Sequence, residues 1–152
     1  MAKQKIDRTC WAQVFSLNTW QEFLAAGGDI TGFRDTRWGR VRQLKPGDYL
    51  MCYLSGVGSW IAILEVESEP FLDTSRIWNN EVYPCRTKVR IVASLSPQTA
   101  VPIRQLRERL TIFRKKNWGL YLMSSPTKWN AADAEVVCDA VLKASYGSRL
   151  QK

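Results

Sequence analysis

The amino-acid sequence predicts a single α+β domain of about five or six strands and about three helices. Two apolar runs at residues 49–54 and 60–66 flank a glycine-containing loop, which predicts a hairpin of buried strands. Residues 85–92 alternate apolar and basic side chains, as in a half-buried strand. Apolar residues at helical spacing over 131–144 predict a C-terminal helix. A chain of 152 residues is long enough to bury one substantial core.

The hairpin is the element around which the rest is expected to pack. Pro46 fixes φ for a tight turn before the first strand, and Gly47 tolerates the positive φ that such turns often need. The second strand stays apolar until Glu65 and stops at Pro70, so its end is expected at the surface.

Residues 10–16 predict a first strand, apolar except for Gln13. Asn18 is expected to cap the following short helix, with Gln21 completing a capping box. Residues 29–42 have no clear period and contain several arginines, so we expect a long basic loop; loops of this length are usually functional.

After residues 85–92, the apolar stripe over 103–113 predicts a helix with outward-facing arginines. Residues 118–123 predict a short apolar strand. Asn130 is expected to cap the final helix. We expect a polar leader at 1–9, one domain at 10–147 and a tail at 148–152.

The basic residues suggest a polyanionic partner, nucleic acid first and an anionic membrane second. The net charge is +8, and residues 86–116 hold nine cations against one acid. A merely solvated basic surface is the alternative, but it does not require such segregation. The expected phosphate-binding residues are Arg34, Arg37, Arg86, Arg104, Arg107, Arg114, Lys115 and Lys116.

Several classes of protein are disfavoured. There is no histidine, which removes Ser-His and Cys-His nucleophile pairs. The four cysteines are far apart with no C-x-x-C, so we expect reduced thiols, no metal and no cofactor. No apolar run is long enough for a membrane span or signal peptide, so we expect a cytoplasmic protein with no membrane partner.

The seven tryptophans fall into groups. Those in apolar strands are expected in the core: Trp11, Trp60 and Trp118. Three others lie among polar residues, where an exposed ring could stack on a nucleobase or simply pack over a loop: Trp20, Trp38 and Trp78.

Five short motifs, taken together and in this order, resemble the EVE domain. They are W-x-x-x-F-S-x-N-x-W (11–20), L-K-P-G-D (44–48), E-V-x-S-E-P (65–70), S-R-I-W (75–78) and Y-P-C-R-T-K-V (83–89). The resemblance implies a PUA-like fold, a curved mixed β-barrel flanked by helices. It also implies similarity to YTH domains, which read N6-methyladenine in RNA with an aromatic cage.

The resemblance also implies a site. Ser16 and Asn18 would bind the base edge, the segment 31–33 would form one cage wall, and Trp78 the other. Tryptophan is common in the family where this chain has Thr31, so Phe33 or Trp38 would have to complete the cage. The implied base-binding residues are Ser16, Asn18, Trp20, Thr31, Gly32, Phe33, Trp38, Trp78, Ser124 and Ser125.

The sequence therefore predicts a nucleic-acid-binding module, a reader of a modified base in RNA or DNA. A neutral base between aromatic faces needs no histidine, metal or cofactor, and the base must be single-stranded or flipped out. Two alternatives stay open. One is an amidohydrolase acting on modified nucleosides, resembling ASCH domains, with Lys45, Thr31 and Glu65 as candidate residues. The other is a protein-interaction domain whose aromatic residues are interface anchors.

Overall fold

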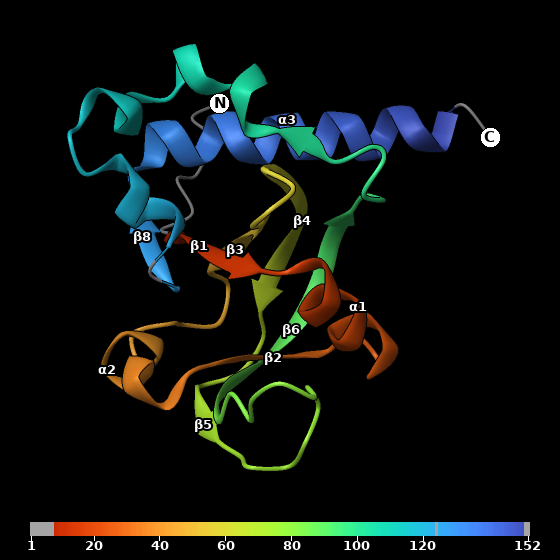
Figure 1. The fold of residues 1–152 in the computed structure, drawn as a ribbon, viewed down its shortest axis with the longest axis vertical. Helices are drawn as coiled ribbons and strands as arrows, with labels where there is room; N and C mark the ends of the chain where they lie inside the picture. The colour runs from red at the N-terminus through yellow and green to blue at the C-terminus, as the bar shows by residue number, and fades with distance from the viewer. Residues whose placement is uncertain (1–7, 124, 151–152) are drawn as a thin grey trace, which may run out of the picture.

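A strongly curled mixed β-sheet forms the centre of the molecule (Figure 1). The structure is a computed structural model that describes residues 8–123 and 125–150. The main path across the sheet is β2 (Ile30–Phe33), β6 (Cys85–Ser94), β4 (Ser59–Val66), β3 (Tyr49–Leu54), β1 (Cys10–Phe15) and β8 (Thr127–Trp129). Strand β5 (Phe71–Leu72) pairs with β6, and β7 (Val101–Pro102) with β4. Strands β1 and β3 are parallel, and the other pairs are antiparallel. The predicted α+β fold with a curved mixed sheet is confirmed.

The predicted hairpin lies at the centre of this sheet. Strand β3 has the expected bounds, and β4 begins one residue earlier than predicted. The register shifts between Cys52 and Tyr53 and again between Ile63 and Leu64. Because such bulges increase the local twist, they help the sheet to curl.

Three α-helices flank the sheet within the described residues. Helix α1 (Leu17–Ala25) follows β1, and the short α2 (Trp38–Val41) follows β2. Helix α3 (Ala131–Leu150) lies across one end of the sheet (Figure 1), where Val137 and Val141 are buried. As predicted, Asn130 accepts a hydrogen bond from the Asp133 amide at the start of α3 (2.8 Å). None of the helices in the described part of the chain has the length and apolar character to cross a membrane.

The cap of α1 differs from the prediction. Ser16 is the N-cap, not Asn18: its hydroxyl accepts from the Thr19 amide at 3.1 Å, and the Thr19 hydroxyl accepts from the Ser16 amide at 2.9 Å. Threonine thus takes the role expected of Gln21, and Asn18 is left on the first turn without a capping role.

Residues 29–42 are more ordered than predicted. They form β2, the 3₁₀ turn η1 (Asp35–Arg37) and α2. Strand β2 is only four residues long and contains Gly32, so its sequence carries little β signal. It is held by pairing with β6, where Gly32 lies opposite Arg86.

The helix predicted over 103–113 is absent. The chain instead makes successive 3₁₀ turns: η2 (Ile103–Gln105), η3 (Arg107–Arg109) and η4 (Thr111–Arg114). The buried carboxylate of Asp133 accepts hydrogen bonds from the amides of Thr111 and Ile112, both at 2.9 Å. Those amides are therefore unavailable to a continuous helix, and Leu110 before them is extended.

The strand predicted over 118–123 is also wrong. Its first residues form a further 3₁₀ turn, η5 (Trp118–Leu122), in which Leu122 is buried while Trp118 and Leu120 are exposed. The edge of β1 is paired by β8, which the sequence analysis missed. Trp118 is consequently not a core residue, whereas Trp11 and Trp60 are buried as expected.

The L-K-P-G-D motif ties the turn before β3 to the start of β1. The buried carboxylate of Asp48 accepts from the Thr9 amide (3.2 Å), the Trp11 indole (3.1 Å) and the Lys45 amide (3.1 Å). Gly47 has a φ of +96°, as expected for this turn.

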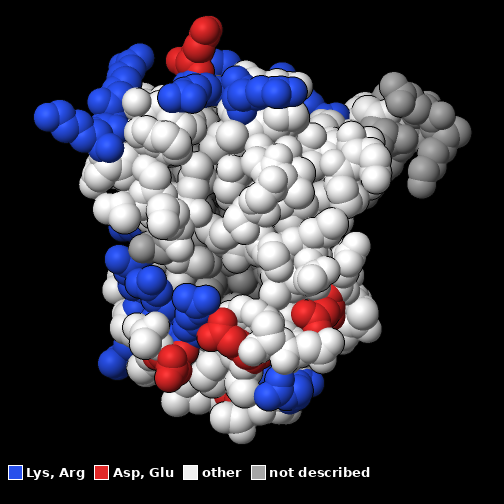
Figure 2. Space-filling view, in the orientation of Figure 1, with Lys and Arg blue, Asp and Glu red and all other residues white. Residues whose placement is uncertain are grey.

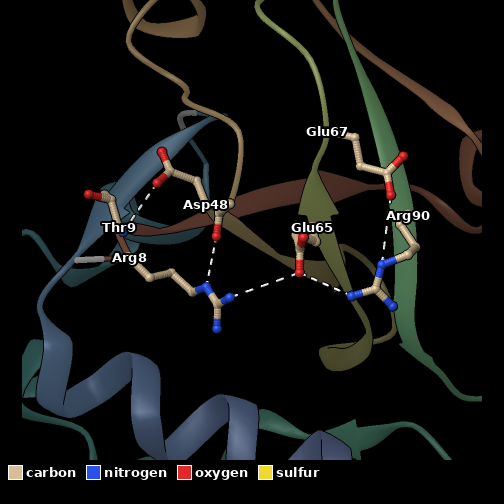
Figure 3. A network of polar contacts seen from close by, with 7 residues as sticks. Arg8, Thr9, Asp48, Glu65, Glu67 and Arg90 are labelled. Carbon is tan, nitrogen blue, oxygen red and sulfur yellow. Dashed lines mark hydrogen bonds and ion pairs between the residues drawn. The ribbon is translucent and has the colours of Figure 1, made fainter. Parts of the chain in front are cut away.

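The polar contacts next to Asp48, made by Arg8, Glu65 and Arg90, are more exposed to solvent. Arg8 donates to the Gly47 carbonyl at 2.7 Å and approaches Glu65, which also accepts from Arg90 at 3.0 Å (Figure 3). Asp48 is therefore the buried member of a network that extends to the surface.

We expect Asp48→Ala to lower the free energy of unfolding by about 3 kcal/mol, because hydrogen bonds to a charged group are worth about 1.5–3 kcal/mol each. The control is Glu67→Ala, whose carboxylate lies 3.7 Å from Arg90 in an exposed ion pair. That change should cost less than about 1 kcal/mol. Urea denaturation measures both, and equal losses would contradict a special role for Asp48.

Candidate functional site

A cavity of about 280 Å³ opens where the end of β1, the start of α1, β2 and the loop 73–84 meet. Gln13, Ser16, Gly32, Trp78 and Tyr83 are among its lining residues. Two hollows share lining residues with it. One of about 590 Å³ lies along α1, and one of about 170 Å³ extends toward Met123 and Ser125. We call the three neighbouring hollows the cleft, in which the central cavity lies between the other two in its shared lining residues.

Gln13 is the polar residue at the inner wall of the cavity. Its side-chain NH₂ group donates to the Thr31 hydroxyl at 2.6 Å and to the Gly32 carbonyl at 3.4 Å. Its side-chain oxygen Oε1 is buried and has no hydrogen-bond partner among the described residues. Because a buried unpaired acceptor costs about 1–3 kcal/mol, its presence in a folded protein calls for an explanation, and a ligand N–H group would supply the missing bond.

Trp78 and Tyr83 supply the aromatic part of the wall. Their rings meet edge to face with centroids 5.2 Å apart. The Trp78 indole donates to the Thr19 carbonyl at 3.1 Å, and only 1% of the residue is exposed. Trp78 therefore borders the cavity but is packed into the fold, whereas the sequence analysis considered an exposed ring.

Gly32 lets the loop come this close to β2. A Cβ atom at this position would lie 2.6 Å from the Tyr83 carbonyl oxygen and 2.9 Å from the Trp78 ring. Tyr83 itself has a positive φ of 49°, which is uncommon outside glycine. The cavity wall thus depends on a close contact between two distant segments.

Arg86 of β6 holds the loop 73–84 in place through hydrogen bonds. Its guanidinium is fully buried and donates to the carbonyls of Tyr83 (3.1 Å), Val82 (3.0 Å) and Ser75, and to the Ser75 hydroxyl (2.8 Å). Burial lowers the pKa of Arg86, and the nearby Asp73 carboxylate opposes that shift. The prediction of a phosphate contact at Arg86 is corrected, because the guanidinium has no exposed surface.

Other predicted aromatic residues lie inside the fold. Trp20 is buried between Phe15 and Phe23, with centroids 5.2 Å from each, so it is a core residue and not an exposed ring. Trp38 is half-buried against the core. Phe33 is also buried, although it reaches the smaller hollow of the cleft.

The predicted polar residues are divided between roles. Ser16 borders the cavity, but its hydroxyl already caps α1. Asn18 lines the hollow along α1. The hydroxyl of the buried Thr31 accepts a hydrogen bond from Gln13, at the position where the EVE-domain resemblance implies an aromatic side chain in the cage. Ser125 accepts from the Val14 amide at 3.1 Å, and Ser124 lies outside the described residues.

The remaining predicted phosphate-binding residues lie on the surface in two groups. Arg34 and Arg37 line the smaller hollow, and Arg34 pairs with Glu81 at 3.2 Å. The others are all exposed on the 3₁₀ segment: Arg104, Arg107, Arg114, Lys115 and Lys116. Figure 2 shows Lys and Arg side chains along the top and at the lower left, with a hollowed surface between these two groups, and a further basic side-chain patch at the bottom.

The residues suggested for an amidohydrolase have other partners. Glu65 is paired with Arg8 and Arg90, and Thr31 with Gln13. Within residues 8–123 and 125–150, no three carboxylate or thiol side chains come together as a metal site would require.

Sequence reasoning missed Gln13 and Tyr83. Gln13 had one available signal, since it is the only polar side chain in the otherwise apolar C-W-A-Q-V-F strand. Tyr83 is the first residue of the Y-P-C-R-T-K-V motif, but the motif does not predict its place at the cavity, which follows from the unusual backbone of the loop that Arg86 holds.

Comparison with solved structures shows the fold. A hypothetical protein from Leishmania major matches with a TM-score of 0.66 and 16% identity, covering 90% of this chain and 96% of that one. The Pho92 YTH domain, in a complex with m6A, matches with a TM-score of 0.66 and 16% identity, covering 93% and 87%. The YTH domain of Zygosaccharomyces rouxii MRB1, in a complex with N6-methyladenosine RNA, gives 0.63 and 17%, covering 96% and 92%. No protein-family model and no curated protein matches the sequence. The chain therefore has a YTH-like fold at low sequence identity.

Gly32→Ala should destabilise the protein by about 1–3 kcal/mol, the usual cost of overpacking, because the added methyl group meets the Tyr83 carbonyl and the Trp78 ring. Gly39→Ala is the matched control: no atom lies within 4 Å of a Cβ there, and the position is in α2. Thermal unfolding compares the two, and an unchanged melting temperature for Gly32→Ala would show that the close contact is unimportant.

Proposed function

We propose that this chain binds single-stranded or locally opened nucleic acid and holds one base, a chemically modified one, in the central cavity. The observation that carries the proposal is the buried, unpaired Oε1 of Gln13, a residue that lines the cavity together with Trp78 and Tyr83. With about 280 Å³, the cavity is close to the lower end of small-molecule sites, about 300–1,000 Å³.

A nucleobase has the chemistry that this wall requires. The exocyclic amine of adenine or cytosine presents N–H donors, and a singly methylated amine keeps one of them. The Gln13 oxygen would accept that remaining N–H, and the half-buried Tyr83, held edge to face against the buried Trp78, would cover one apolar face of the base. A base without a donor would leave the oxygen unpaired, which disfavours its binding.

The surroundings fit a polyanion. Arg34 and Arg37 lie at the smaller hollow, and the exposed cations of residues 104–116 form a second basic group on the surface. Two of the structural neighbours were solved in complexes with m6A or N6-methyladenosine RNA, which makes a methylated adenine the first ligand to test.

We also assign the chain to the EVE-type readers, because three of the five motifs supply the framework of the site. Asp48 of L-K-P-G-D anchors β1, Trp78 of S-R-I-W forms part of the wall, and Arg86 of Y-P-C-R-T-K-V holds the loop. Ser16, Asn18 and Ser125 remain proposed contacts at the mouth of the cleft.

Gln13→Met tests the proposed acceptor, because it keeps the length of the side chain and removes the amide. We expect binding to weaken by about 1–3 kcal/mol, the cost of leaving a ligand donor unsatisfied. Fluorescence anisotropy with short RNA and DNA strands, carrying either N6-methyladenine or adenine, measures the change and the discrimination. Circular dichroism checks that the variant folds.

The control is Thr87→Val. The Thr87 hydroxyl is also buried without a partner in the described structure, but Thr87 is not among the residues that line the cavity. Thr87→Val should leave binding unchanged. The proposal fails if Gln13→Met binds every strand as the unaltered protein does, or if the unaltered protein binds none.

The exposed cations should contribute affinity that is independent of base identity. Replacing Arg104, Arg114 and Lys116 with glutamine should flatten the plot of log K against log[salt] by about 0.7 for each phosphate of a single strand that is no longer neutralised. Changing Lys88 and Lys143, which are exposed on β6 and α3, is the control. Equal slopes for all three proteins would mean that residues 104–116 are only solvated.

A further inference from the structure

We propose that residues 107–123 carry a second base-binding position, which stacks a nucleotide next to the one in the central cavity. The inference rests on the proposed function and adds a feature of the ligand, namely that recognition extends beyond a single base. The site consists of Arg107, Phe113 and Trp118, which we call the aromatic platform.

The platform is an exposed cluster of two rings and one cation. Trp118 keeps 37% of its surface exposed, and its ring lies 5.1 Å from that of Phe113 at an angle of 52°. The Arg107 guanidinium carbon lies 5.1 Å from the Phe113 centroid and 5.7 Å from that of Trp118. Arginine beside exposed aromatic rings is the arrangement on which unpaired bases stack in single-strand-binding proteins.

One exposed apolar residue, Met123, lies between the platform and the smaller hollow beside the cavity. Met123 is 74% exposed and lines the smaller hollow together with Gly32 and Tyr83. A Cβ atom on Gly119 would lie 3.9 Å from the Met123 sulfur, so Met123 reaches back to the residue next to Trp118. A strand leaving the cavity past Met123 would therefore arrive at Trp118.

The charge around the platform identifies nucleic acid as the occupant. Five cations of residues 107–123 are exposed, with Glu108 as the one acid among them: Arg107, Arg109, Arg114, Lys115 and Lys116. The Lys115 ammonium also donates to the Tyr121 hydroxyl at 2.8 Å and lies over its ring. Lysine is depleted at protein–protein interfaces, whereas alternating aromatic and basic side chains suit a single strand.

The segment is held before any ligand arrives. Asp133 of α3 accepts hydrogen bonds from the Thr111 and Ile112 amides and from the Thr111 hydroxyl (3.1 Å). The Trp129 indole donates to the Tyr121 carbonyl at 3.3 Å. Because these bonds fix the chain on both sides of Trp118, stacking a base would cost little ordering of the protein.

The test compares two ligands, an RNA of about eight nucleotides with a central N6-methyladenine and the free N6-methyladenosine nucleoside. Trp118→Ala should weaken binding of the RNA by about 5- to 100-fold, the loss expected for one stacked base, and leave binding of the nucleoside unchanged. Trp118→Phe should retain most of the affinity, because it keeps a ring.

Leu120→Ala is the matched control. Leu120 is 53% exposed in the same 3₁₀ turn, so it tests simple apolar contact. It should change the affinity for RNA by no more than about twofold, since an aliphatic side chain offers no ring for stacking. Photo-crosslinking from a 4-thiouridine next to the methylated base should label the tryptic peptide 117–128, which contains Trp118.

Each outcome decides between the two proposals. If Trp118→Ala binds the RNA as the unaltered protein does, the platform is wrong and the cavity proposal stands. Equal losses in Trp118→Ala and Leu120→Ala would mean an ordinary apolar contact and would also overturn stacking. If the unaltered protein binds neither RNA nor nucleoside, the proposed function itself fails.

Discussion

The candidate site depends on one buried cation, the guanidinium of Arg86. It donates hydrogen bonds to carbonyl and hydroxyl oxygens of residues 75–83. Its Nη1 atom also lies 3.6 Å from the Asp73 carboxylate. A buried charge is strongly unfavourable unless its N–H groups form hydrogen bonds. The loop 73–84 must therefore follow a path that brings its oxygen atoms to the guanidinium of Arg86 on β6. That course presses Trp78 and Tyr83 against Gly32, and the cavity lies between them and β1.

The sequence predicted best those elements whose signal is local. The hairpin β3–β4 and helix α3 have long apolar patterns: the hairpin lies where predicted, and α3 begins where predicted but continues beyond the predicted end at 144 to Leu150, into the expected tail. Strand β2 was missed because four residues with a glycine carry too little pattern, and it forms through pairing with β6. The helix predicted over 103–113 failed for a long-range reason, since the carboxylate of Asp133, twenty-two residues after Thr111, binds the amides that the helix needed.

For the site, some of the residues that the motifs suggested lie around one cavity, and others have different roles in the fold. Trp78, Ser16 and Gly32 do line the cavity. Arg86 was misassigned because an alternating pattern predicts one exposed face, whereas Cys85, Arg86 and Thr87 are all buried, with β2 and β5 paired to this part of β6. Whether Oε1 of Gln13 has a hydrogen-bond partner depends on the atoms that surround it in the folded protein, and no pattern of residues in the sequence predicts that.

The position of β1 in the sheet has a consequence for how the molecule forms. Both of its edges are paired with strands that occur later in the chain: Cys10 lies beside Tyr49 of β3 and beside Trp129 of β8. During synthesis from the N-terminus, the strand that supplies Gln13 is made before the other strands of the sheet, and its last partner, β8, is made after all of them. Until then an apolar strand with an open edge remains available for pairing with other chains. Nascent or truncated chains that lack β8 would therefore be prone to aggregation through β1, even where the hairpin has already folded.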